Sequence, residues 1–484
     1  MTACHTHRWR WLLVLGLLAN GPTSAEPATP GIPPAAPPAL AESPRETGAK
    51  KPEMQTGVPR HSLDGELPHD PLLRELLAWA DRNNADIELA NARLRQAEAE
   101  RALAAADRRP WLHGGLNAER KRLPESSMRD GDGNRHRIPA YRSQLFDTHL
   151  SAGYEIDLFG RQQLRAASAE ALLAAGEAEW RAVRLSVRHE VIAAYADFRL
   201  AYDLLALARR ALLLQETLLS ATSARVESGI DAPSRTREAA HATDAIRQDI
   251  AEYEASRRHA LARLAQLLGE ETAGLPRELH DAEATYFADD IPLPALPANL
   301  PASLLSRRPD IAAADKLREA SRIDAERIRL ERYPALTLTG SLGFISDSLQ
   351  RWLRGEALAW LVGGALGGPL LDGGRNAARH AGAQAASEMA EAAWRRQVYT
   401  ALAEVESALS RLAASETRLA AQNRQQGRLQ NALASARQAK VGGRHGRGAL
   451  LSTELQTLEH ETLLRSTRRD HLAAWAASRH ALGE

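Results

Sequence analysis

Apolar residues recur every three or four positions over two unusually long stretches of the chain. In the first, 161–228, only Gly176 interrupts the helix-forming residues, and no proline occurs between Pro139 and Pro233. Its apolar positions follow heptad-like spacing: Val187, Val191, Tyr195, Phe198, Tyr202 and Leu205. This spacing predicts a helix with a narrow seam for a neighbouring helix. At about 1.5 Å per residue, the helix would be roughly 100 Å long.

The second proline-free stretch follows Pro369 and has a comparable seam. The seam residues are Val398, Leu402, Val405, Leu409 and Leu412. Both long helices end at glycine, the first at Gly229 and the second at the pair 442–443, and a further helix follows each. A short break between two helices returns the chain antiparallel beside itself, so we expect two long helical hairpins. A soluble coiled-coil rod would explain these helices equally well.

Four segments between the helices alternate apolar and polar residues with period two instead. They span 111–121, 148–159, 336–344 and 358–371. Each is about 10 residues long, which is the length that a tilted strand needs to cross a bilayer. Leu338 and Leu342 alternate with Thr337, Thr339 and Ser341, so we expect these two leucines to contact lipid. A strand with one face on a soluble core is the alternative.

The chain contains the same pattern twice. The run 84–87 is echoed by 308–311, and Arg109-Pro110 by Tyr333-Pro334, at one constant offset of 224 residues. Beyond the first hairpin the offset shortens to about 215, which fits a longer polar loop at 124–140. We therefore predict a first repeat over 71–290 and a second over 291–484, each with a helix, a β-hairpin, a very long helix and a further helix.

The first residues are typical of an export signal. Arg8 and Arg10 precede a short apolar run, and small residues follow up to Ala25, which predicts a signal peptide over 1–25. Residues 26–70 are rich in proline and small residues and predict an extended linker. Cys4 is the only cysteine and precedes the apolar run, so we expect neither a lipid anchor nor a disulfide.

Four strands per chain leave two open edges, which hydrocarbon does not tolerate. Single-chain barrels use about eight strands or more, so we expect a barrel that several copies share. The predicted fold class is mainly α with a transmembrane β-barrel portion. It has a two-fold internal repeat that gives four β-strands and two long α-helical hairpins per protomer. Three copies would form a 12-stranded barrel above an α-helical periplasmic tunnel.

Four sequence runs resemble the outer-membrane factor (TolC-like) family and, within it, the OprM/NodT branch. They are 154–161 (YEIDLFGR), 304–311 (LLSRRPDI), 333–338 (YPALTL) and 369–375 (PLLDGGR). The resemblance implies the passive outer-membrane exit channel of a Gram-negative multidrug efflux system, which exports small amphiphilic compounds. It also implies a homotrimer in outer-membrane lipid, with a periplasmic adaptor protein and an inner-membrane pump of the resistance-nodulation-division type as partners.

Other functions explain less of the sequence. A duct for type I secretion or heavy-metal efflux is the nearest alternative, and a periplasmic coiled-coil scaffold would leave the four strands unexplained. The formal net charge of +1 argues against a nucleic-acid partner. The glycine run 363–368 lacks the Lys-Ser/Thr ending of a phosphate loop. We expect no enzyme activity, cofactor or metal.

Charged residues gather around the two predicted helix breaks. They are Asp231, Arg235, Arg237, Arg444, His445, Arg447 and Glu454, with Glu238 as a further acid. We expect them at the periplasmic mouth of the tunnel, where trimerisation would repeat them around a narrow opening. The alternative is a solvated turn whose cations favour the adjacent helix C-termini. Ser452 stands where many relatives of the family carry an aspartate.

Overall fold

The computed structural model describes residues 70–129, 131–133, 135–280, 293, 308–441 and 447–483. The predicted signal peptide, 1–25, and all of the predicted linker except Asp70 lie outside these ranges. So does the break at 442–446 between the last two helices.

Helices make up most of the described chain. Those of the first half are α1 (Pro71–Asn83), α2 (Ala85–Ala106), α3 (Arg161–Glu227), α4 (Pro233–Leu268), η2 (Thr272–Gly274) and α5 (Arg277–His280). Those of the second half are α6 (Pro309–Leu330), η4 (Gly355–Ala357), α7 (Arg375–Val441) and α8 (Arg447–Leu482). Corresponding helices have equal lengths: 22 residues in α2 and α6, 67 in α3 and α7, and 36 in α4 and α8. In the ranges described, no helix is long and apolar enough to cross a membrane.

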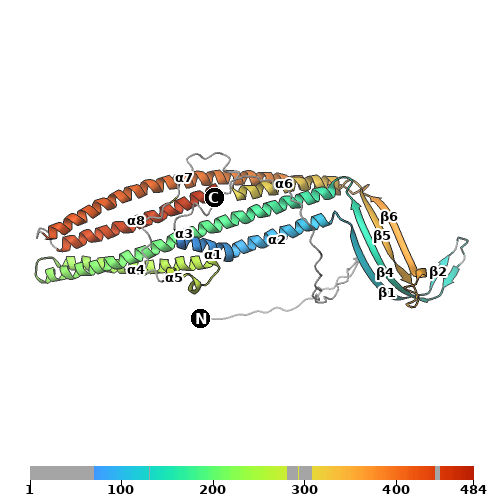
Figure 1. Ribbon diagram of the computed structural model, residues 1–484, viewed down its shortest axis with the longest axis horizontal. Coiled ribbons are helices and arrows are strands. Elements are labelled where there is room, and N and C mark those ends of the chain that lie inside the picture. Colours follow the sequence, from blue (N-terminus) through green and yellow to red (C-terminus); the bar gives the residue numbers. More distant parts are fainter. Residues whose placement is uncertain are drawn as a thin grey trace, which may run out of the picture. The chain divides into compact units, whose positions relative to one another are not determined.

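The helices form two long antiparallel hairpins. α3 packs against α4 and α7 against α8, while α6 and α8 also contact α3. Figure 1 shows the C-terminal ends of α3 and α7 at one end and the strands beyond the other. Because few residues separate α3 from α4 and α7 from α8 in the sequence, each long helix lies beside the one that follows it. The predicted mainly helical fold with a small sheet is confirmed.

The two long helices bury their seams differently. In α3, Val191, Tyr195 and Phe198 are fully buried and pack with residues of α1 and α4. In α7, Leu412 is buried but Leu402 is 45% exposed. The reason is that α3 packs against five other helices of the chain, whereas α7 packs against α6 and α8. Within the single chain, the predicted seam of α7 is therefore buried at Leu412, half-buried at Val398, Val405 and Leu409, and exposed at Leu402.

One antiparallel sheet joins the two halves. Its strands are β1 (Trp111–Leu123), β4 (Tyr141–Ile156), β5 (Ala335–Ser346) and β6 (Leu358–Gly367), in the order β1-β4-β5-β6. The hairpin of the first half thus pairs with that of the second through β4 and β5. β1 and β6 are the outer strands, and each has a neighbour on one side only within the described sheet.

Three strand predictions need correction. The strand expected over 148–159 starts earlier and ends at Ile156, because Asp157 accepts a hydrogen bond from the backbone N–H of Gln163 (2.8 Å) and turns the chain into α3. The expected loop at 124–140 contains a small ribbon of two strands, β2 (Ser126–Arg129) and β3 (Arg135–Ile138). The fourth strand ends at Gly367, shortly before Pro369, which has no N–H for a ladder.

Candidate channel wall and helix-hairpin tips

The register of the sheet gathers apolar side chains on one face. Leu342 pairs with Leu150 on one side and with Trp360 on the other, and Leu338 pairs with Tyr154. Directly opposed residues of an antiparallel pair point to the same face. Leu342 is 52% exposed and Trp360 73% exposed. The chain thus leaves a continuous apolar surface uncovered, and such a surface requires an apolar environment.

The opposite face of the same sheet is polar. Ser151 pairs with Ser341, and Glu155 with Thr337. His149 and Asp147 are the next two residues of β4 on this face, and the ring Nδ1 of His149 lies 2.9 Å from a carboxylate oxygen of Asp147. The sheet is therefore apolar on one side and polar on the other, as a wall between lipid and water is.

An internal ion pair closes the turn between α3 and α4. α3 ends at Glu227, Gly229 follows with a positive φ of 72°, and α4 begins at Pro233. Asp231 accepts hydrogen bonds from Arg225 Nε (2.6 Å) and Nη2 (3.1 Å). The hydrogen bond from Arg225 lowers the pKa of the Asp231 carboxyl, and the same bond raises the pKa of Arg225. Arg225 lies six residues before Asp231, inside the predicted long helix, and is therefore not among the charged residues that the sequence pattern selects at the break.

The remaining predicted residues of this turn do not form one cluster. Arg235 Nη1 lies 3.4 Å from Glu238, an i,i+3 neighbour on the first turn of α4. Arg237 is exposed. Exposed pairs of this kind contribute little to stability, so this tip has the properties of a solvated turn with one well-formed pair.

A second pair links α7 to α8 near their shared turn. Arg437 Nη2 lies 3.0 Å from Glu454 Oε1, and the Glu454 side chain is 21% exposed. Of the predicted cations, Arg444 and His445 lie outside the described residues. Arg447 is the first residue of α8, and its side chain also lies outside them.

Ser452, where the resemblance predicts an aspartate, bonds to its own helix. Its Oγ donates to the Ala449 carbonyl at 3.0 Å. The Ser452 hydroxyl is uncharged, so it cannot form an ion pair that would hold the periplasmic mouth of the tunnel closed. The acidic group found at this tip is Glu454, two residues further on.

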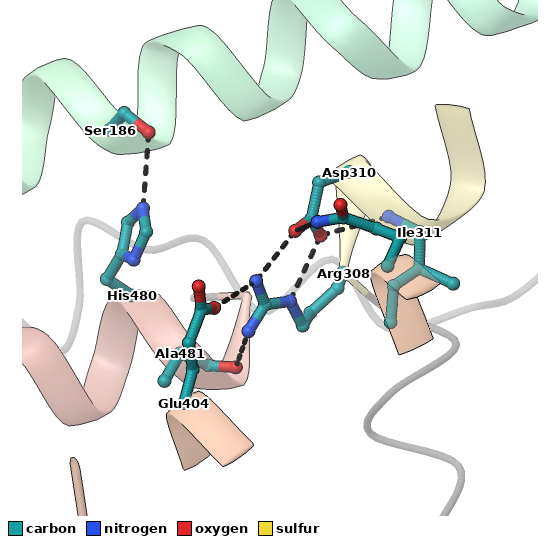
Figure 2. A network of polar contacts seen from close by, with 8 residues as sticks. Ser186, Arg308, Asp310, Ile311, Glu404, His480 and Ala481 are labelled. Carbon is teal, nitrogen blue, oxygen red and sulfur yellow. Dashed lines mark hydrogen bonds and ion pairs between the residues drawn. The ribbon is translucent and has the colours of Figure 1, made fainter. Parts of the chain in front are cut away.

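The run 304–311, which resembles the family, includes Arg308, whose buried side chain is the centre of a polar network (Figure 2). The Arg308 side chain is only 4% exposed and donates to Asp310 (3.0 and 2.6 Å), to Glu404 (2.7 Å) and to the Ala481 carbonyl (3.0 Å). Burial opposes the charge of Arg308, but its bonds to Asp310 and Glu404 outweigh this and raise its pKa. One side chain thus ties the start of α6 to α7 and to the end of α8.

Two histidines adjoin this network. His480 Nε2 lies 3.2 Å from Ser186 Oγ, and its ring centroid is 5.1 Å from that of His189. Burial lowers the pKa of both rings, and for His480 the neighbouring His189 and Arg308 lower it further. Within the part of the chain that the structure describes, no three His, Cys, Asp or Glu side chains are grouped to hold a metal ion.

The family model described as outer membrane efflux protein matches residues 76–270 and again 300–484. The chain belongs to this family, which confirms the resemblance found in the sequence and the location in the outer membrane. The probable efflux pump outer membrane protein SepC of Pseudomonas putida is 31% identical over 66% of this chain, which covers 65% of SepC, just under two thirds. OprJ of Pseudomonas aeruginosa is 29% identical over 84% of this chain and 79% of its own length. The solved outer-membrane channel OprN has a TM-score of 0.74 at 28% identity and covers 86% of this chain and 90% of its own.

Proposed function

We propose that the protein is the outer-membrane exit channel of a tripartite efflux system and that it conducts passively. The observation that carries this proposal is the sheet with one apolar, uncovered face and one polar face. Such a sheet suits a barrel wall, with lipid outside and a water-filled lumen inside. In this arrangement Leu338 and Leu342 contact lipid, and the inner-membrane pump supplies the energy.

The working unit that we propose is a homotrimer. The outer strands β1 and β6 each leave one edge unpaired in the described sheet, and in lipid every backbone polar group needs a partner. On α7, Met389, Tyr399 and Leu402 are exposed, Tyr399 by 71%. Three copies would pair the edges in a 12-stranded barrel and cover these side chains where helical hairpins of neighbouring copies meet.

The domain organisation that we propose is a tandem of two copies, 71–290 and 291–484. The equal lengths of corresponding helices support it, as do the two separate matches to one family model. At the inner end of the tunnel, the pairs Arg225–Asp231 and Arg437–Glu454 would hold the hairpin tips, and the cations at 444–447 would favour anions in a narrow mouth.

Similar proteins bear names that indicate a class of substrate. TtgF of Pseudomonas putida is named a toluene efflux pump outer membrane protein, and OpmQ a pyoverdine export outer membrane protein. We therefore propose small amphiphilic compounds as substrates, and a periplasmic adaptor and a pump of the resistance-nodulation-division type as partners.

Purification of the full chain in mild detergent tests the proposal. We expect a trimer by light scattering and steady single-channel conductance in planar bilayers. A folded, monodisperse monomer without conductance would refute both the shared barrel and the channel.

A further inference from the structure

The first hairpin of the sheet extends further than the second. Phe146 of β4 is the last residue that pairs with β5, opposite Ser346. β1 and β4 then continue together for five more pairs, from Glu119 opposite Leu145 to Leu123 opposite Tyr141. This two-stranded extension carries side chains past the edge of the four-stranded sheet.

On the apolar face, the extension changes abruptly from apolar to cationic. Leu116 and Ala118 of β1 are followed on the same face by Arg120 and Arg122, because alternate residues of a strand share a face. On β4, Phe146 is followed by Gln144 and then by Arg142, which pairs directly with Arg122. Three exposed arginines, Arg120, Arg122 and Arg142, therefore border the apolar surface. We call them the arginine border.

The arginine border has no acidic partner among the described residues. The ion pairs found near it are Lys121–Glu119 (3.4 Å), on the opposite face, and Arg137–Glu125 (2.5 Å), and none includes these three arginines. Like charges directly opposite each other in a sheet are unfavourable. Arg122 and Arg142 are held in this way, so a bound anion would relieve their repulsion.

The height of the arginine border fits a membrane surface. A strand tilted by about 40° rises roughly 2.6 Å per residue along the barrel axis. The apolar rows run from Leu336 to the level of Phe146, ten residues along β5, which gives about 26 Å, close to the roughly 25 Å apolar band of such barrels. The rings of Phe146 and Trp352, with centroids 6.2 Å apart, lie at this boundary, and the arginines begin about 5 Å beyond it.

We propose that the arginine border binds the phosphate groups of lipids in the outer leaflet of the outer membrane. This inference rests on the proposed function, which puts the helices in the periplasm and the hairpin turns outside. Guanidinium groups bind phosphate through paired hydrogen bonds. The described turn of the second hairpin has no comparable cluster, since its Arg351 is paired with Asp347 at 2.9 Å and Arg354 is a single exposed arginine. Each trimer would present three arginine borders.

Binding of lipid A to the full-length protein in detergent tests this inference. The probes are lipid A with both phosphates and lipid A from which both have been removed, with inorganic phosphate as a third arm. The test variant combines Arg120→Ser, Arg122→Ser and Arg142→Ser. The matched control combines Lys121→Ser, Arg137→Ser and Arg351→Ser, three cations that already have carboxylate partners.

We expect the parent to bind the phosphorylated lipid, the test variant to bind it about 100-fold more weakly, and the control to stay within about threefold of the parent. Equal losses in both variants, no preference of the parent for the phosphorylated lipid, or full competition by equimolar inorganic phosphate would each overturn the inference. Single-channel conductance separates the two proposals. If the test variant conducts like the parent, the proposed channel function holds whatever the lipid-binding result. If the parent itself does not conduct, the proposed channel function is refuted.

Discussion

The two halves of the chain secure the same helix junction with different chemistry. In the first half, the buried Asn84 donates from its side-chain amide to the Leu267 carbonyl near the end of α4, at 2.8 Å. In the second half, 224 residues later, Arg308 donates to the Ala481 carbonyl near the end of α8, at 3.0 Å. Both carbonyls lie two residues before a glycine with positive φ, 66° at Gly269 and 81° at Gly483. The common requirement is a buried donor for this carbonyl.

The difference lies in what each donor needs for itself. The Asn84 Oδ1 accepts from the backbone N–H groups of Asp86 (2.9 Å) and Ile87 (3.1 Å), so one neutral residue both caps α2 and binds α4. Arg308 cannot cap a helix, and its buried charge requires Asp310 and Glu404. The second junction therefore includes α7 through Glu404, whereas the Asn84 junction is complete with α2 and α4. The charged Arg308 thus connects three helices, and the stability of this junction depends on each of its partners.

The two halves should respond alike where they share one face of the sheet, and there the largest effect is expected. Leu150 and Leu342 are cross-strand partners from different halves. Leu150→Arg and Leu342→Arg should each cost about 2–4 kcal/mol per copy in the middle of a bilayer, and a trimer multiplies this by three. Trimer yield in the outer-membrane fraction measures the effect. Ser151→Arg and Ser341→Arg, partners on the polar face, are the controls; equal yields for all four variants would place the faces wrongly.

At the helix junctions the halves should differ. Arg308→Met leaves Asp310 and Glu404 without their cation and should destabilise the protein by about 2–4 kcal/mol, less than a fully buried pair because both acids are partly exposed. Asn84→Ala loses a cap and one buried bond, about 1–3 kcal/mol. The midpoint of thermal unfolding, followed by helical circular dichroism, ranks the two.

A compensating variant sharpens this test. Adding Asp310→Asn and Glu404→Gln to Arg308→Met should restore part of the loss, because the acids without a partner are then neutral. A triple variant that is less stable than Arg308→Met alone would show that the acids stabilise the junction independently of the arginine.

Much of this fold follows from local patterns. The period-two rows and the heptad spacing place the strands and long helices, because each pattern needs only neighbouring residues and one buried or lipid-facing side. The α7 seam shows the limit. Its spacing is comparable to that of α3, but within one chain α7 has fewer helices to pack against, and Leu402 stays exposed. Periodicity indicates that a helix needs a neighbour and does not say whether that neighbour belongs to the same chain.

The site residues were harder to predict, because their partners are set by the turn geometry. Asp231 is bound by Arg225, six residues earlier, and Glu454 by Arg437, seventeen residues earlier. The run 304–311 resembles the family, yet the resemblance does not predict the bonds of Arg308 to Glu404 and Ala481, because these residues are far apart in the sequence. The sequence indicates that Asn84 and Arg308 share a role only through the repeat, because the two residues are separated by its offset of 224 residues.

The second junction should contribute to the pH dependence of stability, beside Asp81 and His471, whose pKa values are also lowered in the folded chain. Burial lowers the pKa of His189 and His480 in the folded chain, while unfolding returns both rings to about 6.5. Below that pH the unfolded state binds more protons, so stability is complete above about pH 6.5 and falls as the pH drops toward the lowered folded pKa values. Asp310, whose folded pKa is held low against burial by Arg308, adds a further loss below about pH 4.

His480→Gln tests this at a position where the first half has Gln266, 214 residues earlier. The variant should lose less of its unfolding midpoint than the parent between pH 7.5 and 5.5. Gln266→His is the matched control, because it adds a histidine away from the Arg308 network. Identical pH profiles for His480→Gln and the parent would exclude this histidine as a source of the dependence.

The smallest effects on stability are expected at the hairpin tips, where the halves again differ in geometry. Asp231 pairs with Arg225 within one turn, whereas Glu454 pairs with Arg437 across two helices. Exposed pairs contribute little to folding, so Asp231→Asn and Glu454→Gln should leave the unfolding midpoint unchanged. If the tips hold a closed mouth, the pair between helices restrains the hairpin more than the pair within a turn.

Glu454→Gln should then raise the open probability in planar bilayers severalfold and Asp231→Asn much less. Ser452→Ala, beside Glu454 but without an ion pair, is the control. Parental gating in both charge variants would show that neither pair holds the mouth, whereas a larger effect of Asp231→Asn would assign the restraint to the turn of the first half.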